Sequence, residues 1–169
     1  MFIVVNCVLL KIAGMILSER FRQLVSDPLA AIWASNCNRR LEPELVRLSG
    51  VQVEADSERL LLFVPLKYGA EFVSNFANTH KLSFLMAIIL TNESYQLKGD
   101  YLSHRACTEP EVAYQRRFLS YFCNALENQF LPSDRAFQAY FDQGSIAVRM
   151  LVREVYEQTP KAGTGKKLL

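Results

Sequence analysis

An apolar run followed by an alternating segment constrains the fold of this chain most. Residues 82–90 read LSFLMAIIL, and nine residues are too few for a membrane-spanning helix, which needs roughly 20. Their β-branched and aromatic content predicts a central strand buried on both faces. After a turn at 91–94, residues 95–101 alternate, with Gln96, Lys98 and Asp100 on one face. The two segments predict a hairpin whose polar face either points to water or lines a ligand site.

Size and charge favour one domain. The chain has 169 residues, half of them hydrophobic and 21% charged, which fits a single full core. Its 19 basic and 17 acidic residues give a net charge of +2 without a basic block, so nucleic-acid binding has no electrostatic support. The four cysteines show neither close pairing nor metal-ligand spacing, which indicates a reduced, cytoplasmic protein.

The first residues need separate treatment. Residues 1–14 are mostly apolar, but no basic residue precedes the apolar run as in a secretory signal, and the run is too short to span a membrane. We favour an upstream extension, while an added edge strand and a weak export or anchor signal stay open. We therefore expect an extension at 1–14, a domain at 15–157 and a polar tail at 158–169.

Strand signals outnumber helix signals along the chain. Helices are expected at 19–26, at 70–78, from Thr108 to residue 131, and in a short segment capped by Ser133. The strand candidates are residues 29–35, 44–54, 60–64, 82–90, 95–101 and 146–153. The helices are too few for a regular βαβ alternation, and no glycine fingerprint opens a helix after a strand. The pattern predicts an α+β protein built on a six-stranded antiparallel barrel, closed or partly split, with flanking helices.

The second strand carries an informative phase. Arg47 and Ser49 alternate in step with Val51 and Val53, which should face the core. Either Gly50 marks a bulge that resets the phase, or Arg47 projects inward or into a cleft.

Familiar catalytic and metal motifs are absent from the sequence. The two histidines, His80 and His104, are 24 residues apart and have no ligand-type neighbour, so a zinc site is not expected. There is no nucleophile elbow, and the AGTGK stretch at 162–166 lacks the spacing of a phosphate-binding loop. The catalytic residues stay unassigned.

A set of polar residues on or beside strands remains. Lys67 precedes the expected helix at 70–78, where a cation suits a bound anion better than it suits the helix. The set is Arg47, Ser49, Lys67, Gln96 and Lys98. A phosphorylated planar cofactor would use such groups, with cations and a hydroxyl on the phosphate and an amide toward the ring. Ordinary solvated strand faces are the alternative.

Several short motifs, in this order, resemble a known family. The motifs are PELVR at 43–47, GVQV at 50–53, LFVP at 62–65, Asn75, YQLKG at 95–99 and QTP at 158–160. Over about residues 17 to 165 the chain resembles the pyridoxamine 5′-phosphate oxidase-like, FMN-binding split-barrel family, specifically its small flavin-binding members. The resemblance implies a six-stranded split barrel that forms a homodimer with two FMN sites at the interface.

The resemblance also implies roles for individual residues. Arg47 would be the first phosphate contact and Lys67 the next, with Gln96 and Lys98 near the flavin or across the interface. The Arg/Lys-rich pattern of true pyridoxamine phosphate oxidases and their basic pair near the C-terminus are missing, so that activity is not expected.

Three functions therefore compete. The first is an FMN-binding protein that acts as a flavin-dependent oxidoreductase on a small molecule of unknown identity. The second is a flavin-less split-barrel dimer that acts as a binding or regulatory module. The third is a haem-binding barrel with His104 as axial ligand. The colour of the purified protein would distinguish them.

Overall fold

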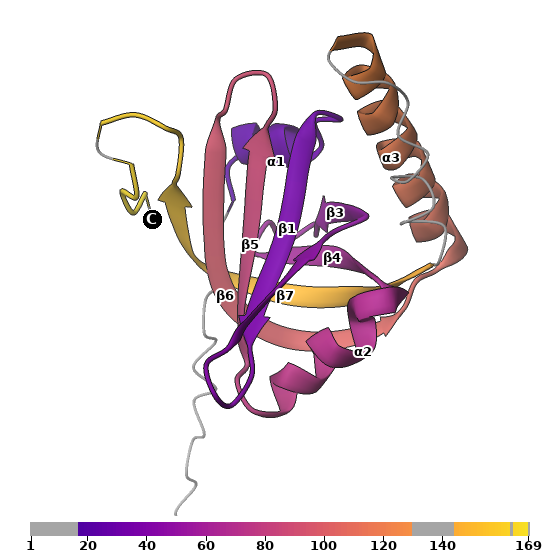
Figure 1. Ribbon diagram of the computed structural model, residues 1–169, viewed down its shortest axis with the longest axis vertical. Helices are drawn as coiled ribbons and strands as arrows, with labels where there is room; N and C mark the ends of the chain where they lie inside the picture. The colour runs from indigo at the N-terminus through magenta and orange to yellow at the C-terminus, as the bar shows by residue number, and fades with distance from the viewer. Residues whose placement is uncertain (1–16, 130–143, 163, 169) are drawn as a thin grey trace, which may run out of the picture.

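The fold is a strongly curled antiparallel sheet of seven strands with flanking helices. The computed structural model describes residues 17–129 and 144–168, except residue 163. The strands are β1 (Ala30–Cys37), β2 (Pro43–Arg47), β3 (Gly50–Val53), β4 (Arg59–Pro65), β5 (Lys81–Ile88), β6 (Ser94–Ala106) and β7 (Ser145–Glu157). Their order in the sheet is β2-β1-β5-β6-β7-β4-β3. In Figure 1, β1, β5 and β6 run side by side, while β7 and β4 cross them at a steep angle. The predicted α+β split-barrel fold is confirmed.

The strand count was wrong by one, because the segment at 44–54 is two strands. The chain turns at Leu48 and Ser49, whose amides donate to the carbonyls of Ile32 in β1 and Phe63 in β4. β2 therefore pairs with β1, and β3 with β4 at the opposite end of the sheet. This corner resets the phase of the segment, because Val46 and Leu48 face the core up to it and Val51 faces the core after it, while Arg47 faces outward. The chain leads directly from β2 to β3, but these two end strands do not pair with each other. The barrel is therefore split between them.

Helices α1 (Glu19–Val25) and α3 (Glu109–Gln129) begin at their predicted caps, while α2 (Leu66–Ser74) begins four residues earlier than predicted. Helix α1 is capped by Ser18, whose Oγ accepts from the Phe21 amide at 3.2 Å. Helix α2 continues into a 3₁₀ turn, η1 (Asn75–Ala77). Helix α3 starts at the predicted capping pattern. The expected short helix after Ser133 and the segment 1–14 lie outside the described residues.

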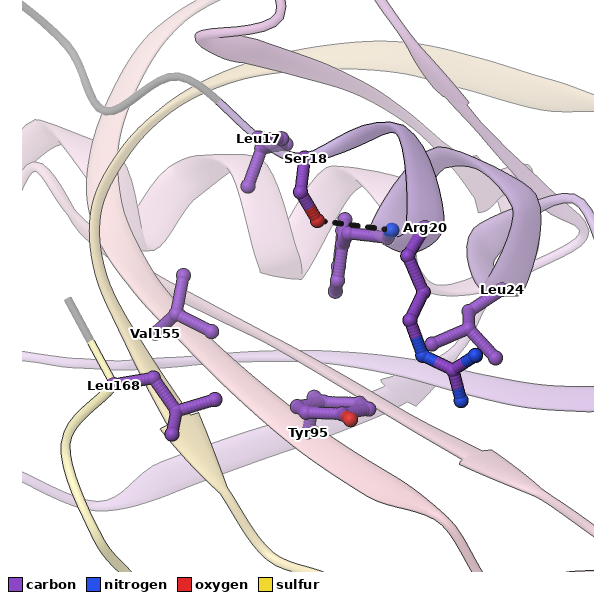
Figure 2. A pocket seen from close by; sticks show the side chains of 8 residues that line it. Leu17, Ser18, Arg20, Leu24, Tyr95, Val155 and Leu168 are labelled. Carbon is purple, nitrogen blue, oxygen red and sulfur yellow. Dashed lines mark hydrogen bonds between the residues drawn. The ribbon is translucent and has the colours of Figure 1, made fainter.

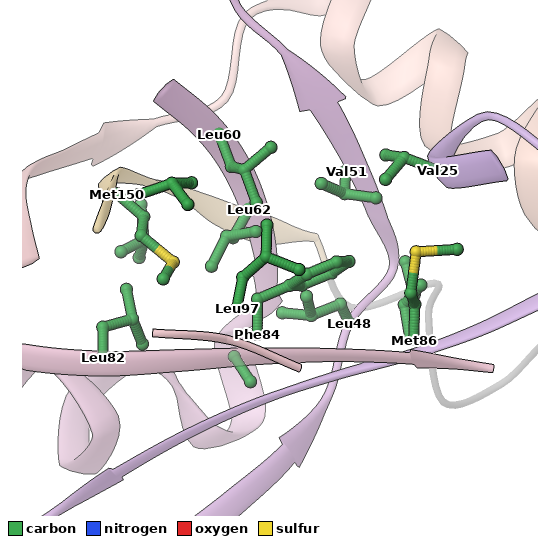
Figure 3. Packing of buried hydrophobic residues seen from close by; sticks show 14 of the residues in the cluster. Val25, Leu48, Val51, Leu60, Leu62, Leu82, Phe84, Met86, Leu97 and Met150 are labelled. Atoms are coloured by element: carbon green, nitrogen blue, oxygen red, sulfur yellow. The ribbon is translucent and has the colours of Figure 1, made fainter. Parts of the chain in front are cut away.

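The core fills the inside of the curled sheet. Figure 3 shows its centre, and the largest fully buried side chains of this cluster include Phe72, Phe84, Leu48, Leu60, Leu62, Met86, Leu97 and Met150. Each such side chain contributes about 1.5–3 kcal/mol through burial, which makes this cluster the main source of stability.

Burial of the two apolar strands differs from the prediction. β5 alternates between buried and partly exposed positions, so the expectation that it is buried on both faces was wrong. β4 is buried on both faces as predicted. The reason is α3, whose Tyr114 ring lies 5.9 Å from the Phe63 ring on the outer side of β4. In the part of the chain that the structure describes, no helix is long and apolar enough to cross a membrane.

Candidate functional site

The outer face of the sheet carries a row of polar side chains across neighbouring strands. Ser35 on β1 pairs with Ser83 on β5, Ser83 pairs with Lys98 on β6, and Lys98 pairs with Glu154 on β7. Directly paired residues of antiparallel strands share a face. Since the alternate residues of β5 are buried in the core, this row lies on the outside of the barrel.

A groove follows this row. Its volume is about 560 Å³, and its lining includes Ser35, Ser83, Lys81, Lys98, Arg153 and Glu154. Small-molecule sites typically have volumes of roughly 300–1,000 Å³, so the groove can accept a ligand of cofactor size. The sequence interpretation missed Ser83 because it buried both faces of residues 82–90, and it missed the others apart from Lys98 because only strand pairing brings them to the groove. The alternation of Lys81 and Ser83 with large apolar residues was the signal for a one-sided strand.

Lys98 is the cation at the middle of the row. Its side chain lies on the Tyr156 ring, with Nζ 4.7 Å from the ring centroid. The Tyr156 hydroxyl donates to Oε2 of Glu154 at 2.8 Å, and Lys167 donates to Oε1 at 2.7 Å. Hydrogen bonds from Lys167 and then Tyr156 lower the pKa of Glu154. Glu154 is therefore ionised at neutral pH and paired with Lys167, near the end of the chain.

Asp100 holds the other two cations of the groove. One carboxylate oxygen accepts from Lys81 at 2.7 Å and the other from Arg153 at 2.8 Å. Partial burial alone would raise the pKa of Asp100, but the hydrogen bonds from Lys81 and Arg153 outweigh it and lower this pKa. The carboxylate thus fixes both cations at one end of the groove.

Gln96 lies beside the groove on the same outer face. Its Nε2 donates to the Ser83 hydroxyl at 3.0 Å, and its Oε1 accepts from Gln158 at 3.4 Å. The predicted facing of Gln96, Lys98 and Asp100 is confirmed by the pairing of β6. The structure therefore brings Gln96 and Lys98 together.

Gly99 makes the close approach between β6 and β7 possible. The ladder shifts register between Lys98 and Gly99, where Arg153 is the extra residue of β7. A Cβ at Gly99 would lie 2.0 Å from the Leu151 carbonyl oxygen. Only glycine fits this position. The close approach at Gly99 therefore determines the relative positions of Lys98 and Arg153.

Arg47 lies on the outer face but away from the groove. Arg47 pairs with Trp33, Trp33 pairs with Leu85, and Leu85 pairs with Gln96. Arg47 and Gln96 are therefore three strand spacings, or roughly 14 Å, apart. The guanidinium carbon lies 4.7 Å from the Phe122 ring centroid and 5.8 Å from that of Trp33. Arg47 thus joins α3 to β1, and its contact with a phosphate stays a prediction.

Ser49 lies in the interior. It is 4% exposed, and its Oγ is 2.8 Å from Gln115 Oε1 and 3.0 Å from the Phe63 carbonyl oxygen. The Ser145 hydroxyl also donates to Gln115 Oε1. Ser49 therefore belongs to a buried polar cluster of Ser49, Gln115 and Ser145 that fastens α3 to the sheet, and its contact with a cofactor stays a prediction.

Lys67 lies in the first turn of α2, because this helix begins four residues earlier than predicted. Its side chain is exposed, with Nζ 5.5 Å from the Tyr68 ring centroid, and it does not line the groove. The expected pairing of Lys67 with Arg47 on one anion also stays a prediction.

The histidines lie beside Tyr101 at the far end of β6. Nδ1 of His104 is 2.6 Å from the Tyr101 hydroxyl, and the His80 ring stacks at 6.1 Å between centroids. Within residues 17–129 and 144–168, no group of three potential metal ligands is present. Axial ligation of haem by His104 stays a prediction.

A second, smaller cavity lies beneath α1. Its volume is about 130 Å³, and Figure 2 shows Leu17, Leu24, Tyr95, Val155 and Leu168 around it. The Tyr95 hydroxyl donates to Glu93, which also accepts from Arg20. The cavity is small and mostly apolar, so it is less suited to a charged cofactor than the groove.

The fold is shared with proteins of very different sequence. No family model matches the chain, and no curated protein does. HupZ of Group A Streptococcus matches with a TM-score of 0.53 at 7% identity, over 89% of this chain and 100% of that chain. A protein named F420 reductase matches with a TM-score of 0.51 at 11% identity, over 82% and 98%. An FMN-binding protein from Syntrophomonas wolfei subsp. wolfei matches with a TM-score of 0.49 at 14% identity, over 80% and 82%. At these identities the likeness shows the fold alone.

Proposed function

We propose that this protein, whose fold is shared with HupZ and an F420 reductase, binds flavin mononucleotide in the outer-face groove. The observation that carries the proposal is the row Ser35, Ser83 and Lys98, with Gln96 beside it, in a groove of about 560 Å³. A protein with the same fold is named F420 reductase, which supports a redox role for this fold.

The groove residues fit the groups of FMN. Lys98, Lys81 and Arg153 offer three cations, and charge-assisted hydrogen bonds to phosphate are the strongest that such a site can make. The hydroxyls of Ser35 and Ser83 add donors. The Gln96 amide can hydrogen-bond the polar edge of a flavin ring. Arg47 and Lys67 remain the phosphate contacts expected from the family resemblance, and variants of each separate the two assignments.

Bound FMN would supply hydride or electron transfer, and the protein would supply position and charge. The cations would hold the phosphate, while Gln96 and the hydroxyls would orient the ring. We propose an oxidoreductase with a small-molecule substrate, without assigning a side-chain acid or base.

We further propose that a second copy of the chain covers the apolar side of the same face. Leu45 and Leu41 are 63% and 76% exposed, and Leu45 shares the outer face with the half-buried Trp33 and Leu85. Large apolar side chains exposed to solvent on a sheet face favour association. Sedimentation equilibrium should show a dimer, and Leu45→Glu should shift it to monomer. A monomeric wild-type protein at micromolar concentration would contradict this proposal.

Titration of the purified protein with FMN and riboflavin, followed by flavin fluorescence, tests the cofactor. FMN should bind saturably and more tightly than riboflavin, because riboflavin has no phosphate for the cations. If neither flavin binds, the protein belongs to the flavin-less class.

A further inference from the structure

The C-terminal tail folds back along the end of β7. The amide of Glu157 donates to the Lys166 carbonyl at 3.0 Å, and that of Leu168 donates to the Val155 carbonyl at 2.9 Å. Tyr156 and Lys167 form an antiparallel bridge. In Figure 1 this segment, coloured yellow, returns beside the end of β7. The tail therefore occupies the side of β7 that β4 occupies in the first half of the strand.

Two side contacts fix this position. Leu168 lies in the small cavity with Val155 and Tyr95, as Figure 2 shows. The Thr159 hydroxyl accepts from the Ser94 amide at 3.1 Å, and the Gln158 amide donates to the Ser94 carbonyl at 2.7 Å. The tail is thus attached to the hairpin that carries Gln96 and Lys98.

Lys98 and Glu154 are direct cross-strand partners, yet the structure shows no hydrogen bond or ion pair between these two residues. Opposite charges at such positions lie about 4.5–5.5 Å apart at Cβ and attract. The hydrogen bonds of the Glu154 carboxylate go to Lys167 and Tyr156 instead, and Lys98 rests on the Tyr156 ring. Lys167 thus pairs with the groove carboxylate that is best placed to neutralise Lys98.

We propose that the C-terminal tail determines the preference of the groove for anionic ligands, with Lys167 as a positioning residue that pairs with Glu154 in place of Lys98. This inference rests on the proposed flavin function. Because Glu154 and Lys167 are both partly exposed, the effect should be moderate.

The test compares Lys167→Met with Lys161→Met. Lys161 is a matched control because it lies on the same tail and pairs with Glu157 of β7. Lys167→Met should weaken FMN binding by roughly two- to fivefold and leave riboflavin binding unchanged. Lys167→Arg should keep wild-type affinity. The double variant Glu154→Gln/Lys167→Met should recover it, because the competing carboxylate is gone. Lys161→Met should change neither flavin.

An NMR measurement tests the tail without any flavin. In wild type, the Tyr156 ring should shift the ε-methylene protons of Lys98 upfield. That shift should disappear in Lys167→Met, where Lys98 moves to Glu154, and persist in Lys167→Arg and Lys161→Met.

The outcomes separate the two proposals. Wild-type protein that binds neither flavin overturns the proposed function, and the NMR shift then decides the role of the tail. Normal flavin binding with an unchanged FMN affinity and an unchanged Lys98 shift in Lys167→Met overturns the tail inference. Equal loss of both flavins in Lys167→Met would also overturn it, because that is a structural defect.

Discussion

Two polar sites of similar chemistry lie on this barrel in opposite surroundings. Under α3, the amide of Gln115 meets the hydroxyls of Ser49 and Ser145, and all three side chains are buried. On the outer face, the amide of Gln96 meets the hydroxyl of Ser83 beside a groove. The buried side chains have their hydrogen-bond partners within the protein. The outer side chains lie beside the cations of the groove.

The difference shows how burial assigns the role of a polar group. A buried amide or hydroxyl costs free energy unless it is hydrogen-bonded, so the cluster under α3 stabilises the fold through pairing. A half-exposed set with cations retains donors that can exchange water for a ligand. Substitutions at the two sites should therefore affect different measurements.

The largest effect is expected at Lys98. Lys98→Met should weaken FMN binding by about 1.5–3 kcal/mol, or roughly ten- to a hundredfold, because a charge-assisted contact is lost. Riboflavin affinity and the free energy of unfolding should stay close to wild type. Lys67→Met, which removes a cation from the far helix α2, is the matched control. Fluorescence titration would contradict the assignment if the control weakened FMN as much.

The next effect is expected at Gln115. Gln115→Leu should lower the free energy of unfolding by about 1–3 kcal/mol, because the hydroxyls of Ser49 and Ser145 lose their buried acceptor. Urea denaturation measures it. Asn124→Leu, at an exposed position of the same helix, should stay within about 0.5 kcal/mol of wild type. If Gln115→Leu changed flavin affinity and left stability intact, the two sites would not be distinct.

A smaller effect is expected at Arg47, between the two sites. Arg47→Met should lower the free energy of unfolding by about 0.5–1 kcal/mol, because the guanidinium stacks on Phe122 and Trp33. Arg47→Met should change the affinity for FMN and the affinity for riboflavin by the same factor. A selective loss of FMN would instead establish the phosphate contact that the sequence predicts for Arg47.

The smallest effect concerns pH and the first turn of α3. Hydrogen bonds from Arg105, and from the Thr108 amide, lower the pKa of Glu111 to about 2. A lowered carboxyl pKa stabilises the fold above pH 4.5, and this contribution is lost as pH falls toward 2. Glu111→Gln should flatten the stability profile in that window. Glu109→Gln in the same turn is the control, and equal flattening in both variants would contradict the assignment.

The sequence predicted the outer face of β6 and missed its neighbours. Alternation placed Gln96 and Lys98 on one face, because side chains of a strand alternate whatever the strand pairs with. Ser83 and Arg153 were not predicted as part of the site, because they join it only through the pairing of β5 and β7 with β6. Gln115 interrupts the apolar face of the helix after Thr108, which was a readable signal for a buried polar contact.

For the same reason, the polar residues that the sequence predicted as one site do not all lie together in the structure. Arg47 and Ser49 share a phase only in a continuous strand, and the corner at Leu48 sends Arg47 to the outer face and Ser49 to the interior. Lys67 moved into α2 because the helix starts at Leu66, directly after Pro65.

By itself, the sequence determined the α+β class, the hairpin of β5 and β6, the facing of the β6 side chains, and the capped starts of α1 and α3. These depend on local periodicity and on side chains a few residues apart. Only the tertiary structure decided the seventh strand, the one-sided burial of β5, and which cations share a groove. Those features depend on where α3 covers the sheet and on pairings between distant strands, and neither leaves a local pattern in the chain.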